Sequence, residues 1–160
     1  MTIREFGLVA RIAAEYAAPV VDDEDQILVV ALGAVGGSVG AGGGRGARFA
    51  AKRLKKDVCE VDLELPLALA ASIEHVSRVL AKAGSLIEDG ETQAPAGQCV
   101  VRAIVGGGFG GMNPVLVTVR LSQVDSERTA MVVRGAAKEG LVKQRAGEKT
   151  AKAMAQVLAL

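Results

Sequence analysis

The sequence predicts an α+β domain: a four-stranded, mainly antiparallel sheet with two helices on one face. Three observations lead to this fold class. Residues 58–65 alternate between apolar and acidic side chains, which is the two-residue period of a strand. A helical apolar stripe follows directly after them. Three further apolar segments and a final amphipathic helix complete the order β-α-β-β-β-α over residues 58–160, which we treat as one domain.

The first predicted strand, residues 58–65, has one wet face. Its acidic residues are Glu60, Asp62 and Glu64, and apolar residues occupy the positions between them. Pro66 favours the start of a helix that extends to Ala83, because proline suits the first helical position. The apolar stripe of this helix contains Leu69, Ile73, Val76, Leu80 and Ala83, and Gly84 is expected to end it.

The remaining elements follow from similar patterns. Strands are predicted over residues 98–105, 115–121 and 128–134, with a polar turn over 122–127 and a last helix over 141–159. This helix should bury Val142, Ala146, Ala153, Met154, Val157 and Leu158. The common core is expected to contain Cys59, Val61, Leu63, Ile73, Val76, Leu80, Val117, Val119, Val133 and Val157.

Residues 1–57 form a separate N-terminal part, which either packs on the domain or mediates assembly. Residues 4–18 suggest a short amphipathic helix that Pro19 ends, and the acidic residues 22–25 suggest a solvated turn. Residues 27–44 contain no charge, begin with six apolar residues and continue into a glycine-rich stretch. A basic stretch follows, with a short helix containing Phe49, Ala50 and Leu54.

Three structures are compatible with residues 27–44. The preferred one is a strand followed by a glycine-rich surface loop or crowded interface. The second is a phosphate-binding loop, in which Gly42, Gly43, Gly44 and Arg45 would surround an anion, although the G-K-[ST] signature is missing. In the third, Gly36, Gly40 and Gly44 line a glycine-zipper helix that contacts a membrane. This stretch resembles the glycine zippers that precede small β-α-β domains in some bacterial envelope proteins.

A second glycine run, residues 106–111, also follows an apolar strand and contains one large side chain, Phe109. The two glycine-rich stretches could meet at one end of the sheet and close over a ligand. No catalytic residue accompanies either of them.

The wet face of the sheet is the candidate surface for a ligand or partner. Strand alternation places seven charged residues on it, Arg128 among them, together with Val100, Ile104, Leu116 and Val132. These charges can pair across strands, or they can bind an anion or a peptide through arginine. With Phe109, the candidate residues are Glu60, Asp62, Glu64, Arg102, Arg120 and Arg134.

Composition excludes several functions. Nineteen basic and eighteen acidic residues leave a net charge of +1, and with three Phe, one Tyr and no Trp we expect no nucleic-acid binding. One His and two separated Cys cannot supply a zinc site, so no metal and no other cofactor is expected. His75 is expected on the solvent side of its helix, and no catalytic residue is assigned.

The sequence therefore favours a cytoplasmic, non-enzymatic binding or self-assembly domain that forms a homo-oligomer, with possible membrane contact through residues 27–44. Two alternatives remain open. The order of strand, proline-initiated helix, strands and closing helix resembles helix-grip lipid-binding domains, which implies a protein that holds a small molecule or lipid. The glycine-rich loop could instead bind phosphate or a nucleotide.

Overall fold

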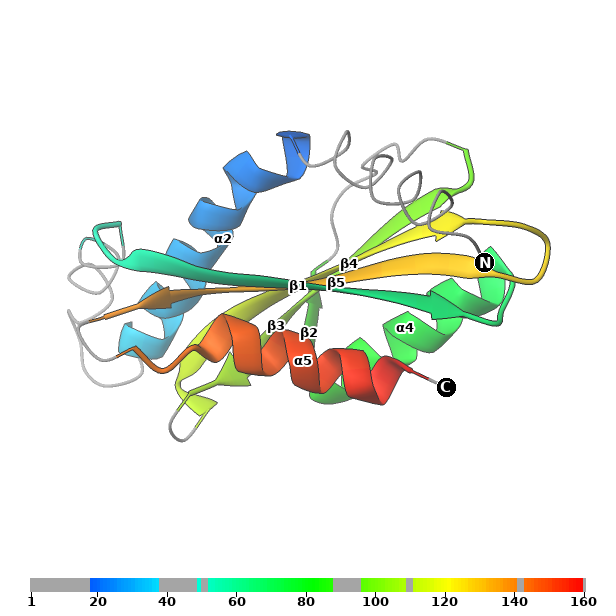
Figure 1. The fold of residues 1–160 in the computed structure, drawn as a ribbon. Helices are drawn as coiled ribbons and strands as arrows, with labels where there is room; N and C mark the ends of the chain where they lie inside the picture. Colours follow the sequence, from blue (N-terminus) through cyan, green and yellow to red (C-terminus); the bar gives the residue numbers. More distant parts are fainter. Residues whose placement is uncertain are drawn as a thin grey trace.

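The structure is a computed structural model that describes residues 18–37, 49, 52–87, 96–108, 111–140 and 143–159. It confirms the α+β class, with an antiparallel sheet in the order β1-β5-β4-β3-β2 (Figure 1). The strands are β1 (Lys55–Leu65), β2 (Gly84–Ile87), β3 (Gln98–Gly107), β4 (Asn113–Gln123) and β5 (Thr129–Glu139). The helices are α2 (Ala18–Gly37), α4 (Leu69–Ala83) and α5 (Ala146–Leu158).

The fifth strand, β2, is absent from the sequence prediction. Its four residues, Gly-Ser-Leu-Ile, are too few to show alternation, and they follow α4 without a break. β2 forms an edge of the sheet by pairing with β3 from Gly84 to Ile87. These four residues form a strand because β3 provides the neighbouring strand with which they pair.

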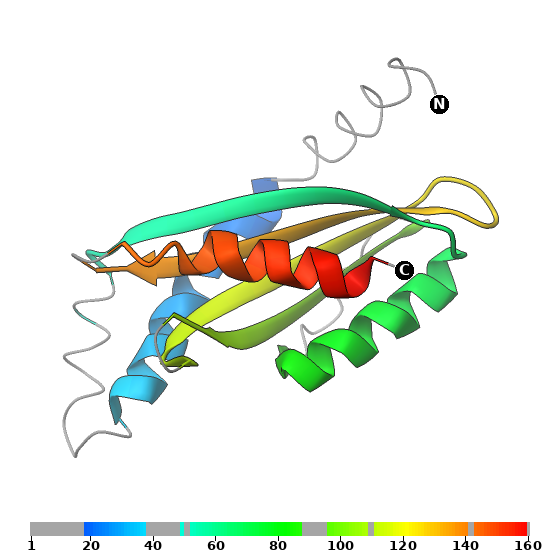
Figure 2. The ribbon, with the colours of Figure 1, turned by 60° about the horizontal axis from the view of Figure 1, so that its bottom comes forward.

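Helices α4 and α5 cover one face of the sheet, as predicted, and α2 lies across the opposite face (Figure 2). The main core lies under α4 and α5 and includes Val76, Leu80, Val117, Val119 and Val133, all predicted to be buried. Val61, Leu63 and Ile73 pack against this core while partly exposed. A smaller apolar cluster under α2 centres on Leu28, Leu116 and Ala136.

The predicted buried side of α5 is wrong at two positions. Val157 is 58% exposed and Ala153 is also exposed. The side that faces the sheet contains Ala151 and Ala155 instead, together with Ala146 and Leu158, which were correctly predicted. Small residues predominate there because α5 lies very close to β5. Since small residues are only weakly hydrophobic, the sequence pattern does not reveal that this side of the helix is buried.

One predicted boundary of α4 changes in the structure, and the other is confirmed. α4 begins at Leu69 rather than at Pro66, which lies in the bend before it. Gly84 caps the helix as predicted, but with an extended backbone, φ −171°. Glycine is required there because a Cβ would collide with the carbonyl oxygen of Ile104 on the neighbouring strand.

The largest correction concerns the apolar run from Ile27 to Leu32, which lies in helix α2 and not in a strand. A short apolar run does not distinguish a strand from a buried helix by periodicity. Helical spacing places Glu24 and Leu28, four residues apart, on the side that faces the sheet, and both are buried. Pro19, predicted to follow the last residue of a helix, accordingly lies in the first turn of α2.

Several sequence predictions fall outside the described residues. These are the helix predicted over residues 4–18, apart from its last residue, the possible phosphate loop Gly42–Arg45, the zipper positions Gly40 and Gly44, Phe109, and Val142. Lys55 and Lys56 belong to β1 and not to a basic helix. Within the described part of the chain, no helix is long and apolar enough to cross a membrane.

Candidate functional site

The sheet face predicted to be wet is partly covered by α2, and it brings most of its predicted charged residues together. Glu60 on β1 accepts hydrogen bonds from Arg120 and Arg134, each at 3.0 Å. Glu64 pairs with Arg128 at 3.1 Å. Asp62 lies opposite Val132 and is exposed. Two carboxylates of β1, Glu60 and Glu64, therefore pair with arginines of the same face within one chain.

The predicted solvated turn at residues 22–25 is wrong, because Glu24 in α2 completes this charged face. Its side chain is 3% exposed and lies between two cations. Arg134 donates from Nε and Nη2 at 3.0 and 3.1 Å, and Lys56 donates at 2.9 Å. Burial opposes ionisation of Glu24, but these hydrogen bonds outweigh it and lower the pKa of the carboxyl group.

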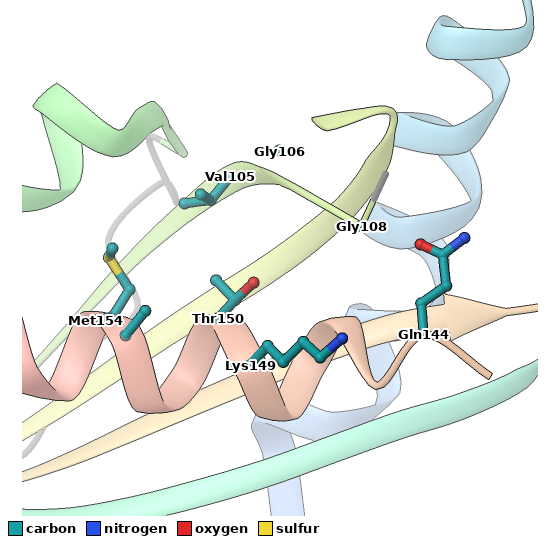
Figure 3. A pocket seen from close by; sticks show the side chains of 8 residues that line it. Val105, Gly106, Gly108, Gln144, Lys149, Thr150 and Met154 are labelled. Atoms are coloured by element: carbon teal, nitrogen blue, oxygen red, sulfur yellow. The ribbon is translucent and has the colours of Figure 1, made fainter. Parts of the chain in front are cut away.

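A pocket of about 680 Å³, which we call the α5 pocket, lies between the end of β3 and the first turns of α5 (Figure 3). This volume is within the range of small-molecule sites. Figure 3 shows Thr150 and Met154 projecting from α5 toward the end of β3. The lining residues are Val105, Gly106, Gly108, Gln144, Lys149, Thr150, Ala153 and Met154.

Glycines of the second glycine run shape this pocket. A Cβ on Gly107 would collide with the side chain of Val115 and come within 3.3 Å of Thr150 Oγ1. Gly108 has a positive φ of 68°, and a Cβ there would collide with the amide of Gln144. The glycines thus allow the end of β3 to approach α5 and the residues that precede it.

The lining of the α5 pocket divides by chemistry. Gln144, Lys149 and Thr150 supply an amide, an amine and a hydroxyl, whereas Val105, Ala153 and Met154 supply apolar surface. Lys149 is the one charged side chain among the lining residues that the structure describes. The arrangement suits a ligand with one apolar part and one anionic or hydrogen-bond-accepting part.

The sequence singled out only one side of this pocket, through the glycine run at residues 106–111. It missed Gln144, Lys149 and Thr150, which appear in the sequence as ordinary polar residues at the start of a solvated helix. No sequence signal marks them, because the packing of α5 against β3 selects which of its side chains meet the glycines.

A second depression, the α2 groove, lies between α2 and strands β2, β3 and β4 and has a volume of about 600 Å³. Its lining is almost entirely apolar and includes Val30, Ala34, Ile87 and Ile104. Asp23, Gln26 and Ser85 are its polar lining residues. The charged residue of this lining, Asp23, is acidic, so the α2 groove is less suited to an anionic ligand than the α5 pocket.

The cysteines and the histidine do not form a reactive pair. Cys59 and Cys99 lie on β1 and β3, which are separated by β5 and β4, so the two strands cannot bring them into a disulfide. Burial raises the pKa of the Cys99 thiol. His75 is half-buried rather than solvent-facing, and its Nε2 contacts the carbonyl oxygen of Leu158 at 3.2 Å. It joins α4 to α5.

Comparison with known proteins yields little. No protein-family model matches the chain, and no curated protein matches it. Among solved structures, the chain is similar to the Zhui aromatase/cyclase from Streptomyces sp. R1128. The identity is 13% and the TM-score is 0.30, over 65% of this chain and 84% of that one. A likeness this slight implies nothing about activity.

Proposed function

We propose that this chain is a binding domain that holds a small amphiphilic anion in the α5 pocket. The proposal rests on the division of the pocket lining into a polar part and an apolar part. One end contains Lys149, Gln144 and Thr150, and the rest is apolar or glycine. Because the one charge in the lining is positive, the polar end favours a carboxylate, sulfonate or phosphate group.

The same lining supports binding more than turnover. Its described residues include no carboxylate, imidazole or thiol that could act as a general base beside the hydroxyl of Thr150. Val105 and Gly106 lie on β3, and Lys149, Thr150, Ala153 and Met154 lie on α5, whereas Gly108 and Gln144 lie just outside these elements. Regular elements therefore hold most of the site. A preformed site of this kind binds with little ordering cost.

Calorimetric titration of the full chain with octanoate, and separately with 1-octanol, tests the proposal. The two probes have equal chains and differ in charge. Lys149→Gln should weaken octanoate binding about 2- to 10-fold, the range expected for an exposed charge-assisted contact. It should leave octanol binding unchanged. Lys82→Gln, on the exposed surface of α4, is the matched control and should change neither.

Substitutions that fill one pocket with a larger side chain test which of the two pockets binds the probes. Ala153→Leu adds apolar atoms to an exposed position of the lining and should weaken both probes without loss of stability. Ala34→Leu makes the same change in the α2 groove and should have no effect. If Ala34→Leu blocks the probes and Ala153→Leu does not, the ligand binds under α2 and our assignment is wrong.

A further inference from the structure

Four cations on the face opposite α4 and α5 form a compact cluster, which we call the basic patch. It consists of Lys56 on β1, Arg102 on β3, and Arg134 and Lys138 on β5. Arg102 and Lys138 have side chains that are only 5% exposed. Lys56 and Lys138 are direct partners in the β1–β5 register. Like charges at such a position repel each other unless anions lie between them.

Helix α2 supplies those anions from three consecutive residues, its acidic turn. Glu24 binds Arg134 and Lys56, as described above. Asp25 pairs with Lys138 at 3.0 Å and with Lys56 at 3.3 Å. Asp23 pairs with Arg102 at 3.4 Å. Every cation of the basic patch is thereby matched by a carboxylate of one helical turn.

The apolar part of the contact between α2 and the sheet is small in comparison. Leu28 is the one large side chain of α2 that is fully buried among the described residues, and it packs on Leu116 and Ala136. Val30, in the middle of the helix, is 56% exposed. Charge complementarity therefore dominates the attachment of α2, which makes the attachment sensitive to substitution and to salt.

Two buried polar atoms beside the basic patch remain without a hydrogen-bond partner among the described residues when α2 is in place. Thr118, 1% exposed, lies between Arg102 and Arg134 in the strand register, and its Oγ1 has no hydrogen-bond partner among the described residues. Arg120 Nε on the same face is buried and also lacks such a partner. The fit of the chain's own α2 thus leaves part of the polar face unpaired.

We propose that the basic patch is a docking surface for an acidic helix, and that α2 of a second copy of this chain can occupy it. Charge complementarity between the acidic turn and the patch identifies the occupant, because α2 is the segment shown to match these four cations. A second copy offers the same carboxylates, so two chains can exchange α2 without loss of any ion pair. The α2 groove would then be built from both chains.

Charge reversal in separate copies tests the exchange. The first variant, Glu24→Arg, repels its own patch, and the second, Arg134→Glu, repels its own acidic turn. Within an exchanged pair of these two variants, both contacts join opposite charges. We expect a mass of two chains by sedimentation equilibrium for the equimolar mixture, and of one chain for each variant alone.

The double variant Glu24→Arg/Arg134→Glu is the matched control, because it restores opposite charges within one chain and should not join either single variant. Circular dichroism establishes that each variant is folded. A mixture that shows only single chains would overturn the proposal.

A second measurement uses the unaltered sequence. Two copies with different affinity tags are mixed, held at high salt to weaken the ion pairs, and returned to low salt. We expect each tag to capture the other copy after the high-salt step and far less without it. Absence of mixed species after that step would contradict exchange, whatever the behaviour of the variants. Neither experiment depends on a ligand in the α5 pocket.

Discussion

Gly135 on β5 and Gly147 on α5 face each other so closely that neither can carry a side chain. A Cβ on Gly135 would collide with the carbonyl oxygen of Gly147 and come within 3.0 Å of the Cβ of Ala151. A Cβ on Gly147 would lie 3.0 Å from the carbonyl oxygen of Gly135 and would collide with that of Asp57. This contact sets the distance between α5 and the sheet, and therefore the position of Thr150 and Met154 in the α5 pocket.

We expect Gly135→Ala to lower the free energy of unfolding by about 1 to 3 kcal/mol, because the added methyl group meets backbone rather than a movable side chain. Gly147→Ala should have a similar effect. Gly140→Ala is the control: a Cβ there meets nothing within 4 Å, so its effect should stay within about 0.5 kcal/mol. Urea denaturation measures all three. If all three variants have the same free energy of unfolding, α5 lies farther from the sheet than the contact of Gly135 with Gly147 requires.

The first turn of α5 is capped by carboxylates from other elements. Glu139 Oε1 accepts a hydrogen bond from the backbone N–H of Ala146 at 2.8 Å, and Asp57 Oδ2 accepts one from Glu148 at 3.1 Å. Glu139→Ala should therefore cost about 1 to 2 kcal/mol, as for the loss of a helix cap. Glu139→Gln keeps an acceptor oxygen and should cost less.

Thermal unfolding distinguishes these two variants, and Glu127→Ala, at an exposed position of the β4–β5 turn, is the control. If Glu139→Gln proves as damaging as Glu139→Ala, the negative charge matters more than the hydrogen bond.

The stability contributed by Glu24 should depend on pH. Its pKa in the folded protein is lowered from the ordinary value of 4.5 by hydrogen bonds from Arg134 and Lys56, which outweigh burial. A lowered folded-state pKa gives stability that is present above the unfolded-state pKa and is lost as the pH falls through the folded-state value. The difference in unfolding free energy between the unaltered chain and Glu24→Gln should be largest near neutral pH.

That difference should shrink below pH 4.5, and urea denaturation at several pH values measures it. A difference that is constant from neutral to acidic pH would show that Glu24 stabilises the fold by packing and not by charge.

The main core and the exposed side of α5 should respond differently to the same substitution. Val119 is fully buried on β4, so Val119→Ala should cost about 1 to 3 kcal/mol through lost burial and a residual cavity. Val157, predicted from the sequence to be buried, is 58% exposed, and Val157→Ala should change stability by less than about 0.5 kcal/mol. Chemical denaturation of both variants tests the orientation of β4 and α5 together.

Strong local periodicity was sufficient to predict part of this structure. The alternation in residues 58–65 and the helical stripe from Leu69 to Ala83 each repeat over several residues, so their buried sides follow from local pattern alone. The same alternation placed Arg102, Arg120 and Arg134 on one face of the sheet with Glu60, and cross-strand pairing was one of the two alternatives predicted for this face. Backbone geometry determines such relationships once the strands are assigned.

The sequence by itself thus determined the fold class, the strands longer than four residues, and the side of the sheet that carries the charges. Tertiary structure alone decided that residues 18–37 form a helix, because burial of Glu24 and Leu28 against the same sheet face requires helical spacing. It also decided which side of α5 is buried, since the close contact of Gly135 and Gly147 selects small residues that carry no hydrophobic signal. The α5 pocket arises from that contact, between residues far apart in the chain, and local pattern does not encode it.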